Sequence, residues 1–388
     1  MPIKNRLAEM HDEITGWRRH LHAHPELLFD VEETAAFVGE RLKEIGVDTI
    51  TPGIGRTGIV ATIKGRTDTK GRVIGLRADM DALPIHEATG LDYASTVEGK
   101  MHACGHDGHT SMLLGAAKYL AETRNFDGTA VLIFQPAEEG GAGGLEMCQD
   151  GMMDRWGIQE VYGMHNMPGM PVGEFAIRPG ALLASSDEFE ITVTGKGGHA
   201  AAPHDAVDTT LVASQIVVTL QSVVARTVDP IKRVVLTVGT FETDSVASNV
   251  IAHTARLRGT VRTLDPEYRA IAEERVRRIA EDTASAFGAK AEMTWTPGYP
   301  ATVNTPDETA FAAEAAKAVS GSVNDATDPI MPSEDFAYML EERPGAYIFI
   351  GNGDTAMCHH PEYNFDDDAI PAGCSWFAEI VERRMPAA

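Results

Sequence analysis

The sequence contains few cysteines. There are four in 388 residues (Cys104, Cys148, Cys358 and Cys374), and no two form a C-x-x-C pair. A disulfide framework needs densely spaced cysteines in a short secreted chain, so this pattern excludes one. We therefore expect a protein of the reducing cytoplasm, in which a cysteine serves as a metal ligand or as a small buried side chain.

Long hydrophobic runs are also missing. No apolar segment approaches the roughly 18 residues that a membrane-spanning helix needs. Residues 1–13 are polar and charged and lack the apolar core of a signal peptide. These two absences predict a cytoplasmic protein with no membrane association.

Positive charge is scarce relative to negative charge. Lys and Arg total 33 against 57 Asp and Glu, which gives a formal net charge of −24. Such a chain repels nucleic-acid phosphates and anionic lipid headgroups. Nucleic-acid binding and membrane-surface binding are therefore disfavoured, although charge alone specifies neither fold nor chemistry.

The remaining composition is that of a globular protein. Hydrophobic residues make up 43% and charged residues 23% of the chain, which excludes intrinsic disorder. The first 183 residues alternate between helix and strand patterns. Helices are expected over 4–24 (ended by Pro25), over 32–45, from about Gly108 and near Leu145, and strands over 58–63, 73–77, 130–135 and 161–165. This alternation predicts an α/β fold with a mainly parallel sheet covered on both faces.

The pattern changes near residue 185. Residues 187–194 alternate strictly between apolar and polar side chains, as in a half-exposed antiparallel strand. A helix over 207–226, strands near 233–241 and 250–262, a helix over 266–287 and a strand over 291–296 are expected next. This order predicts an inserted α+β open-faced sandwich. We therefore expect a discontinuous domain of residues 1–183 and 296–388, interrupted by a domain of residues 184–295.

Residues 53–58 satisfy the dinucleotide-binding pattern G-x-G-x-x-G. A dinucleotide site needs this loop to begin a helix, but the strand-like run I-V-A-T-I follows at 59–63. We interpret the glycines as a turn. A phosphate-binding loop and a G-x-S-x-G nucleophile motif are both absent from the sequence.

The densest chemical feature is H-A-C-G-H-D-G-H at residues 102–109. Five side chains able to bind metal or move protons fall within these eight residues. A lone histidine is more often structural, but this grouping favours a metal site, because thiolate and imidazole suit zinc and its first-row neighbours. The small glycine and alanine residues let the backbone approach an ion closely.

Adjacent glutamates follow a predicted strand in Q-P-A-E-E-G, residues 135–140. Like charges repel, and a nearby cation would offset their desolvation. One glutamate could then bind metal while the other acts as a general base. Considered without the other motifs, this pair of glutamates is explained equally well by a solvated acidic turn.

Three other segments carry similar side chains at or after strand ends: R-A-D-M-D-A-L-P (77–84), G-M-H-N (163–166) and C-H-H-P (358–361). Together with the two motifs above, these segments offer Cys, His and Glu from separate parts of the chain. Sheets of α/β proteins build their sites at such ends. The combination indicates a first-row metal site.

These motifs, with G-K-G-G-H-A-A-x-P-H at 195–204 and H-x-P-x-Y-x-F at 359–365, resemble the amidohydrolase branch of the aminoacylase/carboxypeptidase metallopeptidase family. That branch includes hippurate hydrolases, N-acetyl-diaminopimelate deacetylases and auxin-conjugate hydrolases. The resemblance runs from Arg19 to Phe365. It implies a zinc-peptidase-like catalytic domain with a mixed, mainly parallel sheet, and an inserted domain used for dimerisation.

The resemblance also implies two divalent metal ions per subunit, usually zinc or manganese and sometimes nickel or cobalt. Carried over residue by residue, the ligands would be Cys104, which bridges the metals, with His106, Glu139, His165 and His359. Glu138 would act as general base on a metal-activated water. Asp79 and Asp81 would orient ligands, and His360 would lie beside the ligands or contact substrate.

Residues of the inserted domain receive roles by the same resemblance. His199 would reach the partner subunit's site and stabilise the oxyanion, and Asn249 and Arg262 would hold the carboxylate of the amino-acid product. An exposed strand arginine is a reasonable alternative interpretation of Arg262. The resemblance therefore also implies a homodimer formed through residues 184–295.

The resulting hypothesis is metal-dependent hydrolysis of an N-acyl amino acid to a carboxylate and a free amino acid. A dipeptidase of the same family is one alternative, and a catalytically silent metal- or small-molecule-binding protein is another. Acetyl, benzoyl, indole-acetyl and longer acyl groups all remain open.

Overall fold

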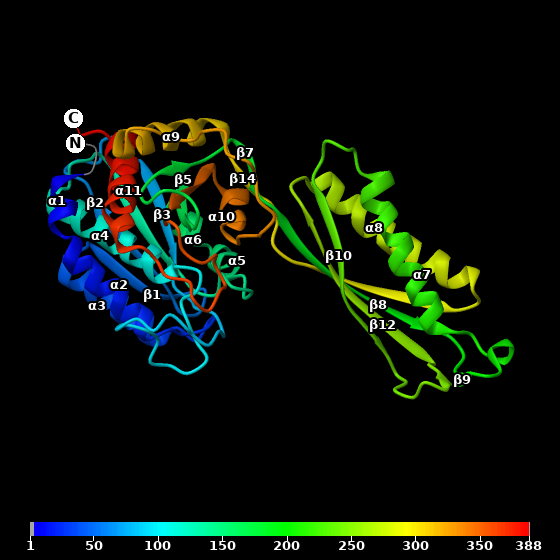
Figure 1. Ribbon diagram of the computed structural model, residues 1–388. Helices are drawn as coiled ribbons and strands as arrows, with labels where there is room; N and C mark the ends of the chain where they lie inside the picture. The colour runs from blue at the N-terminus through cyan, green and yellow to red at the C-terminus, as the bar shows by residue number, and fades with distance from the viewer. Residues whose placement is uncertain (1–3, 388) are drawn as a thin grey trace. The chain divides into compact units, whose positions relative to one another are not determined.

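The computed structural model describes residues 4–387, and residues 1–3 of the polar N-terminal segment lie outside this range. The chain forms two compact units (Figure 1). The first takes its described residues from the ranges 1–182, 303–328 and 335–388, and the second comprises 183–302 and 329–334. The second unit extends past residue 296 because the following turn packs on it: the Tyr299 carbonyl accepts a hydrogen bond from the Ser186 N–H (2.9 Å).

The first unit is built around a seven-stranded sheet. Its strands, in spatial order, are β1 (Thr49–Ile54), β2 (Gly58–Lys64), β4 (Thr129–Gln135), β3 (Val73–Asp79), β5 (Glu160–Met167), β15 (Gly345–Gly351) and β6 (Phe175–Ala176). The four strands from β4 to β15 are parallel, and β1, β2 and β6 run antiparallel to their neighbours. The expected α/β class with a mixed, mainly parallel sheet is confirmed. The G-x-G-x-x-G segment lies in the β1–β2 hairpin, without a helix after it.

The two faces of this sheet have different environments. Alternate side chains of β3, namely Ile74, Leu76 and Ala78, enter the main hydrophobic core. The helices of this unit are α1 (Asn5–Glu9), α2 (His11–Ala23), α3 (Glu32–Ile45), α4 (His106–Thr123), α5 (Gly143–Gln149), α6 (Met152–Arg155), α9 (Pro306–Ser320), α10 (Phe336–Glu342) and α11 (Ile370–Arg384). Side chains of α4, α9 and α11 join this core. On the opposite face, the guanidinium of Arg77 lies over the Phe336 ring of α10.

The parallel strands deliver several chain segments to one edge of the sheet. The strands β3, β4, β5 and β15 all end there, at Asp79, Gln135, Met167 and Gly351. The acidic and histidine motifs of the sequence lie at these strand ends or in the loops that follow them, and G-M-H-N lies within β5. Parallel topology therefore concentrates residues that are far apart in the chain.

The second unit is an open-faced sandwich. Its antiparallel sheet has the order β10 (Val234–Thr243), β12 (Thr254–Thr263), β8 (Ser185–Thr194) and β13 (Lys290–Pro297). Helices α7 (Thr209–Ser222) and α8 (Pro266–Ala286) cover one face, over a core that includes Phe189, Ile191 and Val193. A π-helical turn continues α7 over Val223–Thr227. The remaining strands described form two short pairs. One pair is β7 (Gly180–Leu183) with β14 (Thr302–Asn304), and the other is β9 (Gly198–His199) with β11 (Val250–Ile251).

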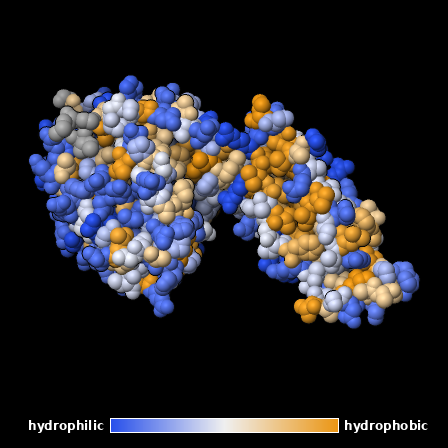
Figure 2. Space-filling view, in the orientation of Figure 1, coloured by the Kyte–Doolittle hydropathy of each residue, from blue (hydrophilic) through white to orange (hydrophobic). Residues whose placement is uncertain are grey.

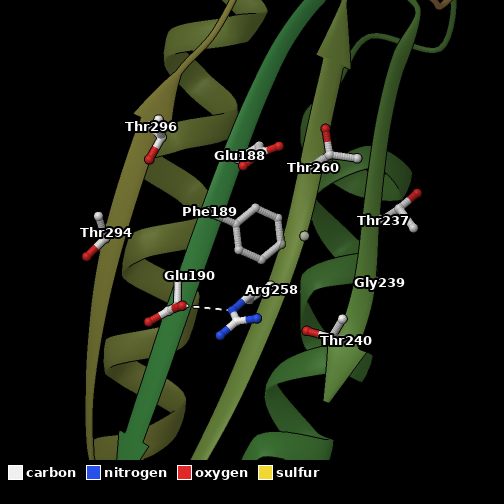
Figure 3. Close-up of a pocket in the computed structure, with 11 residues that line it drawn as sticks. Glu188, Phe189, Glu190, Thr237, Gly239, Thr240, Arg258, Thr260, Thr294 and Thr296 are labelled. Carbon is white, nitrogen blue, oxygen red and sulfur yellow. Dashed lines mark hydrogen bonds and ion pairs between the residues drawn. The ribbon is translucent and has the colours of Figure 1, made fainter. Parts of the chain in front are cut away.

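The face of this sheet that lacks helices is polar and hollowed. Glu188, Glu190 and several threonines line the hollow (Figure 3). The carboxylate of Glu190 accepts a hydrogen bond from Arg258 Nε at 2.9 Å. The strict alternation in residues 187–194 thus separates a helix-covered apolar face from a polar face.

No helix within residues 4–387 combines the length and the apolar character needed to cross a membrane.

Small side chains bring α8 close to the sheet, because Ala272, Ala280 and Ala284 are all fully buried in the core of the second unit. We predict that Ala280→Leu overpacks this contact and lowers the free energy of unfolding of the second unit by about 1–3 kcal/mol. The measurement is hydrogen exchange of peptides from β8 and α8 under native conditions. The exposed neighbour Glu281 provides the control: Glu281→Leu should leave exchange nearly unchanged.

Candidate active site

The H-A-C-G-H-D-G-H segment forms a tight turn into helix α4. Gly105 precedes the helix with φ of 84°, a left-handed conformation that favours glycine. The side-chain amide of Asn166 donates to the Cys104 carbonyl (2.6 Å), and the Tyr363 hydroxyl donates to Asn166 Oδ1 (2.7 Å). The turn is thus fixed by β5 and by the C-terminal segment, with Cys104 and His106 on either side of Gly105.

The predicted metal ligands lie together. Cys104 Sγ is 3.4 Å from His165 Nε2, and His359 Nε2 is 3.3 Å from Glu139 Oε1. His106 Nε2 lies 3.9 Å from the same Glu139 oxygen. Potential ligand atoms of Cys104, His106 and His165 form one close group, and those of Cys104, Glu139 and His359 form another. Cys104 belongs to both groups.

The donor atoms fit divalent metal ions. His106 donates its Nδ1–H to the Asp81 carbonyl (2.8 Å), which leaves the buried Nε2 without a hydrogen-bond partner. An unsatisfied buried polar atom costs about 1–3 kcal/mol, whereas coordination to a metal ion uses this lone pair. A carbonyl that fixes the ring in this way is typical of histidines that bind metals.

The surroundings of Cys104 favour the protonated form of its thiol. Its hydrogen bond with Cys358, its burial and the nearby charge of Glu139 raise the pKa of the Cys104 thiol well above the ordinary value. A coordinating thiol loses its proton to the charge of a metal ion. The thiolate form therefore needs a cation at this position.

A second cluster lies beside these ligands and consists of Asp79, His106 and His109. His109 donates from Nδ1 to Asp79 Oδ1 (2.7 Å) and accepts the Asn166 N–H at Nε2 (2.9 Å). Both ring nitrogens of His109 are therefore engaged. Burial opposes the ionisation of Asp79, but the Arg77 guanidinium and the hydrogen bond from His109 lower the pKa of Asp79 well below its ordinary value. Arg77 donates to the other carboxylate oxygen of Asp79 (2.8 Å), so both oxygens of Asp79 are engaged as well.

The two glutamates of Q-P-A-E-E-G are held by their backbone. Asp81 accepts the N–H groups of Glu138 and Glu139 at 3.0 and 3.1 Å, one on each carboxylate oxygen. Burial raises the pKa of Asp81. Glu138 is 7% exposed, and its Oε2 is 4.0 Å from His106 Nε2. The structure therefore places a second carboxylate directly beside the ligand atoms.

The remaining predicted site residues are His360 of the first unit and three residues of the second unit, His199, Asn249 and Arg262. His360 is exposed, and its Nδ1 accepts the Glu362 N–H (3.1 Å). In the second unit, the Ala200 N–H bonds to the Asn249 carbonyl (3.0 Å), so Asn249 and His199 line the same hollow. Arg262 is on β12, where it donates to Ser333 Oγ (3.0 Å). Within the second unit, His199 and Asn249 are brought together, and Arg262 is not part of their hollow.

Several residues of the site were not predicted. His109 was part of the densest motif, and its spacing of three from His106 on a helix was an available signal. Arg77, Asn166 and Cys358 were within quoted motifs but carried no signal for their contacts. Their roles depend on neighbours far away in the sequence.

Comparisons with known proteins identify the family of this chain. The family model for peptidase family M20/M25/M40 matches residues 75–383. The chain belongs to this family.

Relatives in the family cover nearly the whole chain. N-acetyl-L-cysteine deacetylase of Bacillus subtilis is 42% identical over 98% of this chain and 90% of its own length. Hippurate hydrolase of Campylobacter jejuni is 41% identical over 97% of both chains. The B. subtilis YXEP structure, described as a dinuclear metal-binding M20 peptidase, has a TM-score of 0.85 and 36% identity over 97% of this chain and 99% of its own. With the ligand cluster above, these findings make the chain a metal-binding amidohydrolase of the M20 family.

The turn between Cys104 and His106 provides a sharp test of the metal site. A Cβ on Gly105 would lie 2.3 Å from Asn166 Nδ2 and 2.4 Å from the Tyr363 hydroxyl. We predict that Gly105→Ala displaces both ligands and strongly reduces bound metal per subunit, measured by elemental analysis after dialysis.

Gly46, which ends α3, is the matched control. It has φ of 80°, and a Cβ added there would meet no heavy atom within 4 Å. Gly46→Ala should cost about 1–2 kcal/mol of stability through backbone strain alone and should leave the metal content intact. Equal metal content in both variants would show that the turn does not position the ligands.

Proposed function

We propose that this protein hydrolyses the linear amide bond of N-acyl amino acids, which yields a carboxylate and a free amino acid. The observation that supports this most directly is the position of Glu138. Its carboxylate lies beside the ligand atoms, while its backbone is fixed by Asp81. Relatives named for deacetylation and for hippurate hydrolysis, both at about 40% identity, support an N-acyl substrate.

Two divalent metal ions, zinc or manganese first and nickel or cobalt otherwise, would be held by the five ligands. His106 and His165 would serve one ion, and Glu139 and His359 the other, with Cys104 shared between them. When bound, such ions polarise a carbonyl oxygen and lower the pKa of water. Asp81 and His109 would keep the ligand side chains in place, and His360 would contact substrate or lie beside the ligands.

Glu138 acts as the general base. Its carboxylate takes a proton from the water that attacks the acyl carbon, and it later gives this proton to the leaving amine nitrogen. The proton thus moves from water to the amine. A carboxylate suits this role when it is buried near the reacting atoms, because it then exchanges protons with substrate and not with solvent.

The second unit provides the remaining groups. We propose that Asn249 and Arg262 bind the carboxylate of the amino-acid part, since an amide N–H and a guanidinium both donate to carboxylates. His199 stabilises the oxyanion by donating a hydrogen bond. The imidazole of His199 is exposed, which leaves it accessible to a substrate.

We further propose a homodimer through residues 184–295. This unit exposes large apolar side chains, including Leu211 and Val218 seven residues apart on α7, and Phe241 on β10. Figure 2 shows hydrophobic residues gathered over parts of the surface of this unit. Ile231 is 84% exposed. Apolar groups gathered on one surface are typical of protein interfaces. Net charge and cysteine content support a cytoplasmic enzyme whose partners are its substrate and its own copy, not nucleic acid or a membrane.

The function is tested by amino-acid release from N-acetyl, N-benzoyl and indole-acetyl amino acids, with dipeptides as a comparison, after metal removal and reloading with zinc or manganese. We expect release only with metal, and faster release from N-acylated substrates than from dipeptides. Glu138→Gln should retain metal and lose about 10²–10⁴-fold in turnover.

The adjacent Glu139→Gln is the contrasting variant, which should lose metal as well as turnover. Full turnover by Glu138→Gln would rule out the general-base role. Wild-type protein that holds metal but releases nothing from any substrate would rule out the proposed reaction.

Sharing of the site between subunits is tested by mixing two inactive variants, His199→Ala and Glu138→Ala. If His199 serves the other subunit, each mixed dimer contains one intact site, so an equal mixture should recover about a quarter of wild-type activity. Subunit exchange is verified by native mass spectrometry. Absence of recovery after verified exchange would contradict sharing.

A further inference from the structure

The loop that carries Glu138 and Glu139 is strained. It spans residues 136–142, between the end of β4 and the start of α5. Ala137 and Ala142 both have positive φ (54° and 56°), which alanine rarely adopts. Such a conformation persists only where the surroundings hold it. The loop therefore depends on contacts from outside itself.

Asp81 holds only the middle of this loop, through the N–H groups of Glu138 and Glu139. A different carboxylate, Asp335, helps to hold the ends, together with two backbone bonds, from the Ala137 N–H to the Leu28 carbonyl and from the Gly143 N–H to the Ala137 carbonyl (both 3.1 Å). At one end, Gln135 Nε2 donates to both oxygens of Asp335 (2.7 and 2.8 Å). At the other end, the Gly144 N–H donates to Asp335 Oδ2 (2.8 Å). One side chain therefore joins the residue before the loop to the first turn of the helix after it.

The same carboxylate is connected to the ligand-positioning cluster. Arg77 donates to Asp335 Oδ1 (3.0 Å), to Gln135 Oε1 (2.8 Å) and to Asp79 Oδ2 (2.8 Å). Asp79 in turn holds His109. Arg77, Gln135, Asp79 and Asp335 are all at most 1% exposed. Water cannot replace these partners, so a change in Asp335 propagates to the loop rather than being compensated by solvent.

We propose that Asp335 is a positioning residue that clamps both ends of the glutamate loop and so sets the place of the general base and of one metal ligand. This proposal rests on the roles assigned to Glu138 and Glu139 above. Asp335 lies nearly 200 residues from the loop in sequence, and it forms a close buried group with Glu138 and Glu334, with carboxylate oxygens within 4.8 Å of one another. The hydrogen bonds that Asp335 accepts from Arg77, Gln135 and Gly144 place its effect on the geometry of Glu138.

The test uses Asp335→Asn in the full-length, metal-loaded protein. The amide keeps the size of the side chain but replaces an acceptor oxygen with a donor, so at least one of the bonds from Arg77, Gln135 or Gly144 is lost. We expect kcat to fall by about 10²-fold with little change in KM, because a small displacement of a catalytic group slows chemistry. In metal-free protein, amides of residues 136–144 should exchange faster than in the wild type.

Rescue distinguishes positioning from general stability. The double variant Gln135→Glu with Asp335→Asn exchanges the carboxylate and the amide, which preserves the net charge and the pairing with Arg77. It should recover most of the lost kcat and the slow exchange. If Asp335→Asn does not fold, Gln135→Ala removes one end of the clamp and should produce a milder form of both changes.

Asp127 provides the matched control at the opposite end of β4. It is 4% exposed and accepts hydrogen bonds from Thr67 Oγ1 and the Thr69 N–H (2.6 and 2.8 Å). Asp127→Asn should reduce stability but leave kcat and the exchange of residues 136–144 unchanged.

Equal effects of the two Asn variants on kcat and on loop exchange would overturn the proposal, as would unaltered exchange in Asp335→Asn. If the wild type hydrolyses no amide, the proposed function fails, and loop exchange alone then decides the role of Asp335.

Discussion

The burial of several carboxylates close together is the constraint on which the rest of the structure depends. Asp79, Asp81 and Asp335 are completely buried, and Glu138 nearly so. Each such charge is strongly unfavourable unless it is paired and hydrogen-bonded. Arg77 pairs with two of them, and backbone N–H groups satisfy the third. His106 and His109 lie against Asp79, and divalent ions held by the ligand cluster would complete the balance of charge.

This constraint explains why strands and loops have separate tasks. The strands supply side chains that hold other side chains in place through hydrogen bonds, such as Arg77 and Asp79 of β3. The ligands come mostly from loops and from the first turn of α4, where backbone geometry can turn side chains toward one point. Gly105 permits this turn, and His359 itself has a left-handed backbone (φ 69°). The rigid sheet and the strained loops together define the position of each donor atom.

Sequence periodicity predicted the elements whose burial is one-sided. The helix over 32–45 and the strand over 187–194 agree closely with α3 and β8. The helix expected over 4–24 is instead broken at Met10, whose backbone leaves the helical region (ψ 2°), a break that the apolar spacing does not reveal. Strand β1 was not predicted, because its sequence T-I-T-P-G-I contains proline and glycine.

The metal ligands could be predicted from the sequence because their motifs are short runs of chemically rare residues. The hydrogen-bond network that positions the loop could not be predicted, because its members are common residues that only the fold brings into contact. Gln135 and Asp335, for example, carry no local pattern that joins them. Periodicity reports which face of an element is buried, but it does not report which polar groups on different elements share a hydrogen bond.

The place of β15 in the sheet has a consequence for how the chain folds as it is synthesised. β15 lies between β5 and β6, yet it follows them by about 170 residues, after the whole second unit. Until it emerges from the ribosome, the edge of β5 is an unpaired strand beside a half-formed site, and such an edge is prone to pair with other chains. Chain topology thus makes the first unit the last to be completed, and aggregation during synthesis is the hazard that this order creates.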